Sequence, residues 1–163
     1  MSMIGNFIAI DSAALACLVA DPERIASFIY PGGADLAPDH LDMDKAWHAI
    51  HFILNGRVWE GDGALGLVIL GGEEIGEDIG YGPARYLTPD QVSDVATALS
   101  KVSSDDVTQR FDPAALDEAE IYPQTWARDD REGLSYVLHY YDKLVSFYRN
   151  AATRGDAVLL FIS

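Results

Sequence analysis

The side chains with the clearest potential for chemistry lie along one predicted helix, from residue 42 to residue 55. At about 100° per residue, Asp44, His48, His51 and Asn55 form a narrow polar stripe beside the apolar face of this helix. Two imidazoles three residues apart, with a carboxylate four residues before the first, can meet at one ion or one ligand. The stripe is therefore the first candidate for a functional site.

Three interpretations of the stripe stay open. In the structural one, Asp42 or Asp44 caps the helix and His51 is hydrogen-bonded at the edge of the core. In the second, the stripe lines a small-molecule pocket. In the third, Asp44, His48 and His51 bind a metal ion, but a zinc site needs a further ligand, and no His-Glu-x-x-His or Cys-x-x-Cys motif is present. The structural interpretation is the commonest for such a stripe, and no cofactor is expected.

A second candidate follows a glycine-rich segment, residues 56–82, which holds nine of the fourteen glycines. Glycine lets the main chain approach a neighbour closely, and long glycine-rich connections are often functional. Near its end stand Tyr81 and then Arg85, the only basic residue between Arg57 and Lys101, in a region rich in carboxylates. Arg85 either forms an internal ion pair or clamps a carboxylate or phosphate ligand.

A third candidate is the aromatic pair Tyr122 and Trp126, on either side of Pro123. The pair either packs a loop onto the core or forms one wall of a pocket. The small-molecule hypothesis requires four side chains from the first two candidates to converge on one cleft: His51, Trp47, Tyr81 and Arg85.

Nucleotide-binding and nucleophile motifs are absent from the sequence. There is no G-x-x-x-x-G-K-[ST] loop and no G-x-S-x-G elbow. The G-x-G-x-x-G spacing at residues 61–66 does not follow a convincing strand, and Glu60 and Asp62 would repel phosphate. Cys17, the single cysteine, lies in an apolar run and is expected to be buried and inert. The sequence identifies no catalytic residue and leaves open whether the chain is an enzyme.

These residues must be positioned by helices and strands. The sequence predicts a mainly helical α+β fold with a small sheet. Residues 3–10 are β-branched enough for a strand, and residues 156–163 form the continuous apolar run of a strand that is buried on both faces. We expect both terminal strands in one sheet and a further strand at residues 83–87. A length of 163 residues fits one domain over the whole chain, residues 1–163.

Helix starts are marked by capping chemistry. Three of them place a side-chain oxygen before a proline in the first helical position: Asp21-Pro22, Thr88-Pro89 and Asp112-Pro113. Gln91 stands where it completes a capping box with Thr88. The longest helix is predicted over residues 130–154, with Gly155 as its end.

Charge restricts the possible partners. Eleven Lys and Arg stand against 26 Asp and Glu, which gives a net charge of −15. The basic residues are scattered singly, so we expect no nucleic-acid partner, and an anionic membrane would repel the chain. The acidity either serves solubility or offers a surface to a basic protein. The N-terminus lacks the basic region of a signal peptide, and a cytoplasmic location is expected.

Four patterns occur in order along nearly the whole chain: Met3-Ile4-Gly5-Asn6-Phe7, Leu41-Asp42-x-Asp44-Lys45-x-Trp47-x-x-x-His51-Phe52, Ile121-Tyr122-Pro123, and Leu144-x-x-Phe147-Tyr148 before Gly155 and a terminal strand. Their order and spacing resemble the YfbM-like family of bacterial proteins, the domain-of-unknown-function family numbered 1877. The resemblance implies a compact α+β domain that usually stands alone, with no established reaction and no catalytic residue to carry over. The family pattern includes His51, whereas His48 looks like a local variation outside that pattern. This difference weakens the metal interpretation.

The function that we expect first is non-enzymatic binding of a basic protein partner, in the manner of an immunity protein that neutralises a toxin. The alternative is a small-molecule or enzymatic pocket near His51 and Arg85. The candidate ligand-binding residues are Asp44, Trp47, His48, His51, Tyr81, Arg85, Tyr122 and Trp126.

Overall fold

An antiparallel sheet lies at the centre of the molecule, and the first and last strands of the chain pair with each other within it. The computed structural model describes residues 1–32, 39–128 and 130–163. The described strands are β1 (Gly5–Ile10), β2 (His40–Asp42), β3 (Glu73–Asp78), β4 (Pro83–Leu87) and β5 (Ala157–Ile162). Their order in the sheet is β2-β1-β5-β4-β3. The predicted α+β fold, with both termini in one sheet, is confirmed.

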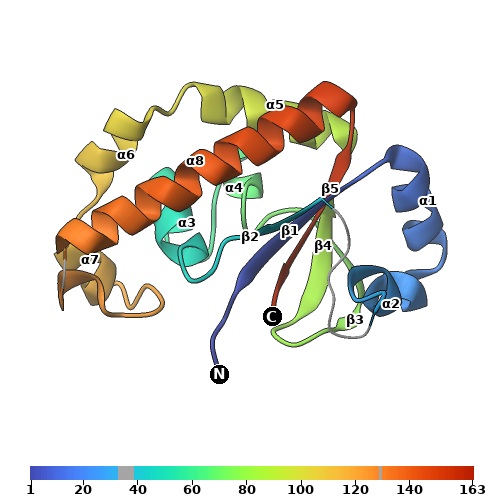
Figure 1. The fold of residues 1–163 in the computed structure, drawn as a ribbon, viewed down its shortest axis with the longest axis horizontal. Helices are drawn as coiled ribbons and strands as arrows, with labels where there is room; N and C mark the ends of the chain where they lie inside the picture. The colour runs from blue at the N-terminus through green and yellow to red at the C-terminus, as the bar shows by residue number, and fades with distance from the viewer. Residues whose placement is uncertain (33–38, 129) are drawn as a thin grey trace.

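Strands β1 and β5 are buried on both faces of the sheet, because nearly every residue in them is apolar. Successive side chains of a strand point to opposite faces. Phe7 and Leu160 therefore enter one core, while Ile8 and Leu159 enter the other. Figure 1 shows the result, a sheet with helices on both sides.

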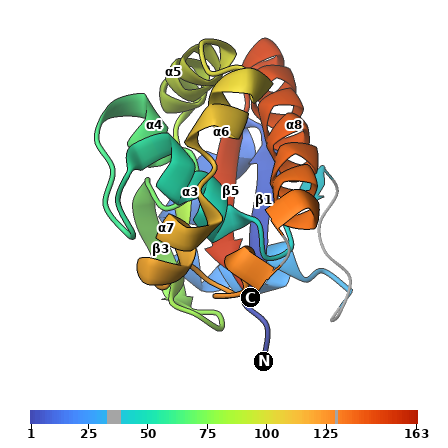
Figure 2. The same cartoon turned by 90° about the vertical axis from the view of Figure 1, so that its left-hand side faces the viewer.

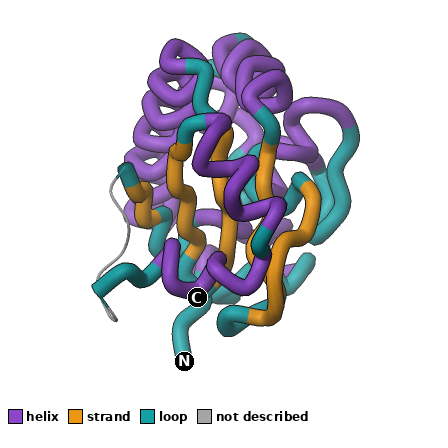
Figure 3. Tube along the Cα trace, turned by 90° about the vertical axis from the view of Figure 1, so that its right-hand side faces the viewer, coloured by secondary structure: helices purple, strands orange, loops and turns teal. Residues whose placement is uncertain are grey.

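One face of the sheet is covered by three short helices: α1 (Ser12–Ala20), the 3-10 helix η1 (Pro22–Arg24) and α2 (Ile25–Ile29). Figure 3 shows the sheet from this side. The helices that share the other core are α3 (Trp47–Asn55), α4 (Gly63–Leu67), α5 (Pro89–Ser100), α6 (Ser104–Arg110), α7 (Pro113–Glu118), the 3-10 helix η2 (Trp126–Arg128) and α8 (Asp130–Arg154). No described helix is long and apolar enough to cross a bilayer.

The long helix α8 is the scaffold of this second layer, as the sequence predicts. It runs beside α5 in both views of the ribbon (Figures 1 and 2). The hydroxyl groups of its buried Tyr141 and Tyr148 donate hydrogen bonds to the carbonyls of Val102 and Val68. These bonds satisfy the polar ends of two large side chains inside the core.

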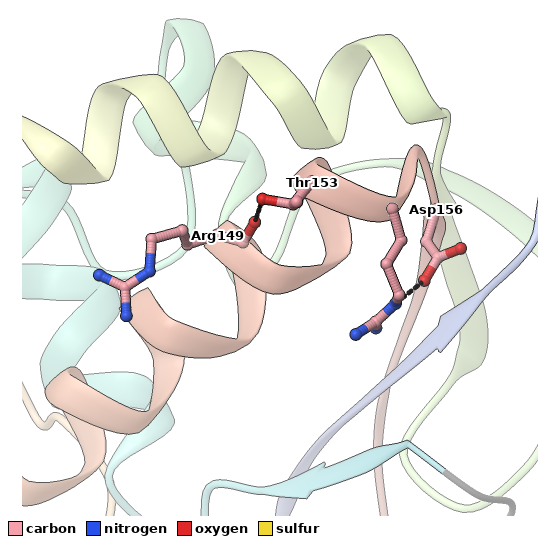
Figure 4. Close-up of polar contacts among 4 residues, drawn as sticks. Arg149, Thr153 and Asp156 are labelled. Atoms are coloured by element: carbon pink, nitrogen blue, oxygen red, sulfur yellow. Dashed lines mark hydrogen bonds and ion pairs between the residues drawn. The ribbon is translucent and has the colours of Figure 1, made fainter.

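The turn from α8 into β5 is held by local polar contacts. Gly155 has a φ of +70°, so the predicted helix end is confirmed. Arg154 Nε donates to the Asp156 carboxylate at 2.7 Å, and the Thr153 hydroxyl donates to the carbonyl of Arg149 (Figure 4). The turn places the last strand directly between β1 and β4.

Three expectations about elements are wrong. The helix predicted from residue 42 begins only at Trp47, because residues 40–42 form β2 and pair with β1. β3 was not predicted, because it is an edge strand with one buried residue, Ile75, in a segment dominated by glycine and carboxylates. Cys17 is exposed, because α1 buries only Leu15 and Leu18.

Candidate functional site

The two histidines of the predicted stripe are sealed inside the protein, each with 1% of its surface exposed. His48 Nε2 donates to the Val58 carbonyl (2.9 Å), and its Nδ1 accepts the main-chain N–H of Tyr122 (3.0 Å). His51 Nε2 donates to the Glu60 carbonyl (3.1 Å). The pocket interpretation is therefore wrong for His51, and the structural interpretation, in which His51 is hydrogen-bonded within the packing, holds, because the segment after α3 folds back over both rings.

The side-chain amide of Asn55 completes the enclosure of His51. Its Nδ2 lies 3.4 Å from His51 Nδ1 and also donates to the carbonyls of His51 and Leu65, both at 3.1 Å. Because Nε2 of both histidines carries the proton donated to a carbonyl, that nitrogen has no lone pair for a metal ion. Among the described residues, no group of three or more His, Cys, Asp or Glu is placed to hold a metal ion.

Burial lowers the pKa of His48 and of His51 from the usual histidine value, since a charged imidazolium is poorly solvated there. The hydrogen bonds to the Val58 and Glu60 carbonyls raise both pKa values, but burial outweighs them. Both rings are therefore neutral at pH 7. Each ring donates a hydrogen bond to a main-chain carbonyl of the loop that follows α3.

Asp44 lies away from the histidines, in the turn between β2 and α3, with a φ of +46°. Its main-chain N–H donates to the Asp42 carboxylate (2.7 Å), and its own carboxylate accepts the Tyr136 hydroxyl (2.9 Å). Burial, followed by the hydrogen bond to Asp44, raises the pKa of Tyr136 well above its usual value. Asp44 thus ties this turn to α8 and does not form a stripe with the histidines.

Tyr122 and Trp126 both have structural partners. The Tyr122 hydroxyl accepts the Met3 N–H (3.1 Å), and the Trp126 indole donates to the Ile121 carbonyl (3.1 Å). These contacts match the interpretation in which the pair packs its loop onto the core. Neither side chain is among the described residues that line the nearby cleft bordered by Trp47, Tyr81 and Arg85.

The structure does bring Trp47, Tyr81 and Arg85 together, at a cleft of about 480 Å³. The cleft lies between the sheet and the segments around α3 and α4. Its described lining is aromatic and aliphatic apart from Arg85, Glu74 and Asn6: Met3, Asn6, Phe7, Trp47, Trp59, Ile69, Leu70, Glu74, Tyr81, Gly82, Pro83, Arg85, Leu160, Phe161 and Ile162. Three of the four side chains of the small-molecule hypothesis therefore meet, and His51 does not.

A single row of cross-strand neighbours forms part of the floor. Phe7 lies opposite Leu160, Leu160 opposite Arg85, and Arg85 opposite Glu74. Directly opposed residues share a face of the sheet. The row therefore runs from a buried aromatic ring to a polar pair at the edge strand.

Trp59, which no motif in the sequence singles out, is the most exposed aromatic residue of the lining at 58%, and Tyr81 is the next at 42%. Trp59 is held in place by a stack of rings. His48 lies between it (4.6 Å between ring centroids) and Trp47 (4.7 Å), and Trp47 in turn stacks on Tyr122 (6.3 Å). His48 is thus a positioning residue for the Trp59 ring. The available signal was a lone tryptophan in a glycine-rich, acidic segment.

Arg85 and Glu74 form an ion pair with a separation of 3.0 Å between Nη2 and Oε1. Their side chains are 38% and 58% exposed, so the pair is open to solvent and is not the internal pair that one interpretation expected. Tyr81 is carried by the turn between β3 and β4. The Asp78 carboxylate holds this turn by accepting the N–H groups of Gly80 and Gly82.

Comparison with known proteins agrees with the resemblance in the sequence. A model of the family described as domain of unknown function DUF1877 matches residues 1–161. Protein YfbM of Escherichia coli strain K12 is 26% identical over 168 residues, which cover 99% of each chain. The crystal structure of YfbM from Escherichia coli, described as a protein of unknown function, matches with a TM-score of 0.74 at 24% identity, over 98% of this chain and 99% of that one, and so has the same fold. Because the family model spans nearly every residue, the chain belongs to the YfbM-like family of domains of unknown function, DUF1877.

Proposed function

We propose that the chain is a binding domain whose cleft takes a small ligand with a flat, apolar body. The observation that carries this proposal is the pair of exposed rings, Trp59 and Tyr81, at a cleft of about 480 Å³. Large aromatic side chains are seldom left exposed together without a partner. Ligand pockets usually enclose about 300–1,000 Å³ behind mostly apolar walls.

The chemistry of the lining favours binding over catalysis. Phe7, Trp47 and Leu160, which are at most 2% exposed, form the packed apolar base of the cleft, and Glu74 and Arg85 neutralise each other. A few polar groups among aromatic walls orient a ligand without activating it. The cleft also lies on strands β4 and β5, which pair with each other in the sheet.

The proposal is tested with N-phenyl-1-naphthylamine, an uncharged probe whose fluorescence rises in apolar sites. We expect saturable uptake at one site per chain, and at least tenfold weaker binding to a variant that combines Trp59→Ala and Tyr81→Ala. Val19→Ala is the matched control, because Val19 is 47% exposed on α1, outside the cleft lining. Absence of uptake, or equal uptake by the double variant, would overturn the proposal.

A second candidate, binding of a basic protein, is favoured by the net charge of −15. Trp59, Tyr81 and Arg85 also belong to the residue types that dominate protein interfaces. Charge complementarity makes such association sensitive to salt. A partner captured at low salt should be lost at high salt and with the double variant. Capture that is insensitive to salt, or that survives in the double variant, would count against this candidate.

A further inference from the structure

We infer that the cleft recognises a free α-amino acid with an apolar side chain, through the paired charges of Arg85 and Glu74. This inference rests on the proposed function, because it names the class of ligand that the same cleft takes. Three properties of the site favour such a ligand: the unused hydrogen-bonding capacity of the ion pair, the charge around it, and its place beside the exposed rings.

The ion pair has capacity left for a ligand. Arg85 uses one nitrogen, Nη2, toward Glu74 Oε1. A guanidinium carries five N–H donors and a carboxylate has two acceptor oxygens. Since both side chains are more than a third exposed, the remaining N–H groups and Oε2 of Glu74 can reach a bound molecule. Guanidinium groups bind carboxylates in a paired geometry, and carboxylates accept strong hydrogen bonds from ammonium groups.

An α-amino acid carries these two complementary charges on one carbon atom. Its carboxylate can lie against Arg85 while its ammonium group lies against Glu74, so that the four charges alternate in sign. Each ligand charge then meets an opposite charge at short range.

The charge of the site argues against ligands with a single charge. An anion would be repelled by the chain, whose net charge is −15. A cation at Glu74 would meet the neighbouring positive charge of Arg85. A zwitterion has no net charge, so it escapes the long-range repulsion and still satisfies both partners at short range.

The apolar part of the ligand has a defined place. Arg85 and Glu74 lie in the same cross-strand row as Leu160, and they share the cleft with Trp59 and Tyr81. A side chain attached to the same carbon as the two charges would therefore extend along the cleft toward the exposed rings. Aromatic pairs prefer offset or edge-to-face contact, which makes phenylalanine a suitable probe.

The test is isothermal titration of the full chain with three compounds that share a phenyl group. L-Phenylalanine has both charges, 2-phenylethylamine lacks the carboxylate, and 3-phenylpropionate lacks the ammonium group. We expect L-phenylalanine to bind at least tenfold more tightly than either analogue. This comparison needs no variant, so it does not depend on how a substituted chain folds.

Two substitutions then assign the charges. Arg85→Gln should weaken binding of L-phenylalanine at least tenfold and leave binding of 2-phenylethylamine unchanged or tighter. Glu74→Gln should weaken the binding of L-phenylalanine and leave the binding of 3-phenylpropionate unchanged or tighter. Arg57→Gln is the matched control, because it changes net charge as Arg85→Gln does but removes the exposed Arg57–Asp62 pair, whose residues are not among the described lining. It should leave all three affinities unchanged.

The possible results separate the inference from the proposed function. Equal affinities for the three compounds would overturn the inference, while the cleft would remain a binding site. Uptake of N-phenyl-1-naphthylamine without any binding of the phenyl compounds would overturn the inference alone. If neither the naphthylamine nor any phenyl compound binds, both are overturned.

Discussion

The buried histidines hold the loop that borders the proposed binding cleft, although neither ring lines the cleft. His48 donates to the Val58 carbonyl, accepts the Tyr122 N–H, and lies between the rings of Trp47 and Trp59. His51 fastens the next part of the same loop through Glu60. The two rings therefore fix the loop that presents Trp59 at the cleft. Their chemistry is that of neutral hydrogen-bonding groups.

The lowered pKa values of the histidines predict that acid destabilises the fold. The unfolded chain binds protons at these rings as pH falls through about 6.5, the ordinary histidine value. The folded chain does so only at lower pH, because burial lowers the pKa of His40, His48 and His51. The stabilising contribution is therefore complete above about pH 6.5 and decreases below it, down to the lowered pKa values.

Urea unfolding at pH 7.5 and 5.5 measures this effect, since most carboxylates stay ionised over that range. We expect a lower free energy of unfolding at pH 5.5. His139→Gln is the control, because His139 is exposed on α8, and it should leave the difference between the two pH values unchanged. A free energy that is equal or higher at pH 5.5 would contradict neutral, structural roles for the buried rings.

For single residues, the sequence predicted part of the candidate site. The types and positions of Trp47, Tyr81 and Arg85 were sufficient to group them, and the structure brings them together. The spacing of His48 and His51 could not reveal their environment, because helical periodicity gives the direction of a side chain within its helix but not what covers it. The covering residues come from the loop after α3, whose path depends on contacts distant in sequence.

The helices and strands that were predicted best are those whose ends are set by residues close together in the sequence. The capping box at the start of α5 is formed as expected: Gln91 N–H donates to the Thr88 hydroxyl oxygen, and Thr88 N–H donates to the Gln91 side chain. Asp112 likewise caps α7, and Ser103 caps α6. Such motifs depend on residues three apart, so they are visible in the sequence. The predicted cap at Asp21 is wrong, because its side chain makes no capping hydrogen bond at the start of the 3-10 helix η1.

Removing the cap of α5 should destabilise the fold by about 1 kcal/mol. Thr88→Ala leaves a first-turn N–H without its acceptor and also breaks the reciprocal contact with Gln91. Thr97→Ala is the control within the same helix, because the Thr97 hydroxyl only bonds back to the Ser93 carbonyl. Chemical denaturation should show a loss for Thr88→Ala and no loss for Thr97→Ala. Equal stability of the two variants would mean that the capping box contributes nothing.

The elements that escaped prediction have non-local causes. β3 exists because Glu73 and Glu74 pair with Tyr86 and Arg85 on β4, although its own composition is acidic and glycine-rich. The late start of α3 follows from the pairing of Leu41 with Phe7 on β1. In both segments, tertiary pairing overrides the local pattern. β3 supplies Glu74, and the segment before α3 leads directly into Trp47. Both segments therefore help to form the cleft.

For the whole molecule, the dominant property is the excess of negative charge. A net charge of −15 on 163 residues produces self-repulsion, which opposes the compact state. Against it, the described residues form three ion pairs, Arg57–Asp62, Arg85–Glu74 and Arg154–Asp156. Pairs with exposed partners contribute little, typically about 0–1 kcal/mol each. Repulsion should therefore outweigh the attraction in these pairs.

Added salt should consequently stabilise the fold. Raising ionic strength from about 0.01 M to 0.1 M shortens the screening length from about 30 Å to 10 Å. We expect the free energy of unfolding at pH 7.5 to increase over this range. Asp94→Lys, on the exposed side of α5, lowers the net negative charge by two and should reduce the salt dependence. A decrease in stability with salt would show that the ion pairs dominate.

The most direct test of the cleft uses the three tryptophans as reporters in a ¹H–¹⁵N NMR titration with benzyl alcohol, a neutral aromatic compound. Trp59 lines the cleft and is 58% exposed, whereas Trp47 and Trp126 are 1% and 5% exposed and donate their indole N–H groups to the Met3 and Ile121 carbonyls. We predict that the indole signal of Trp59 shifts saturably and by more than that of Trp47, while the signal of Trp126, which is not among the described lining, stays in place. If the Trp59 signal does not move, or if Trp126 moves instead, the cleft is not the binding site.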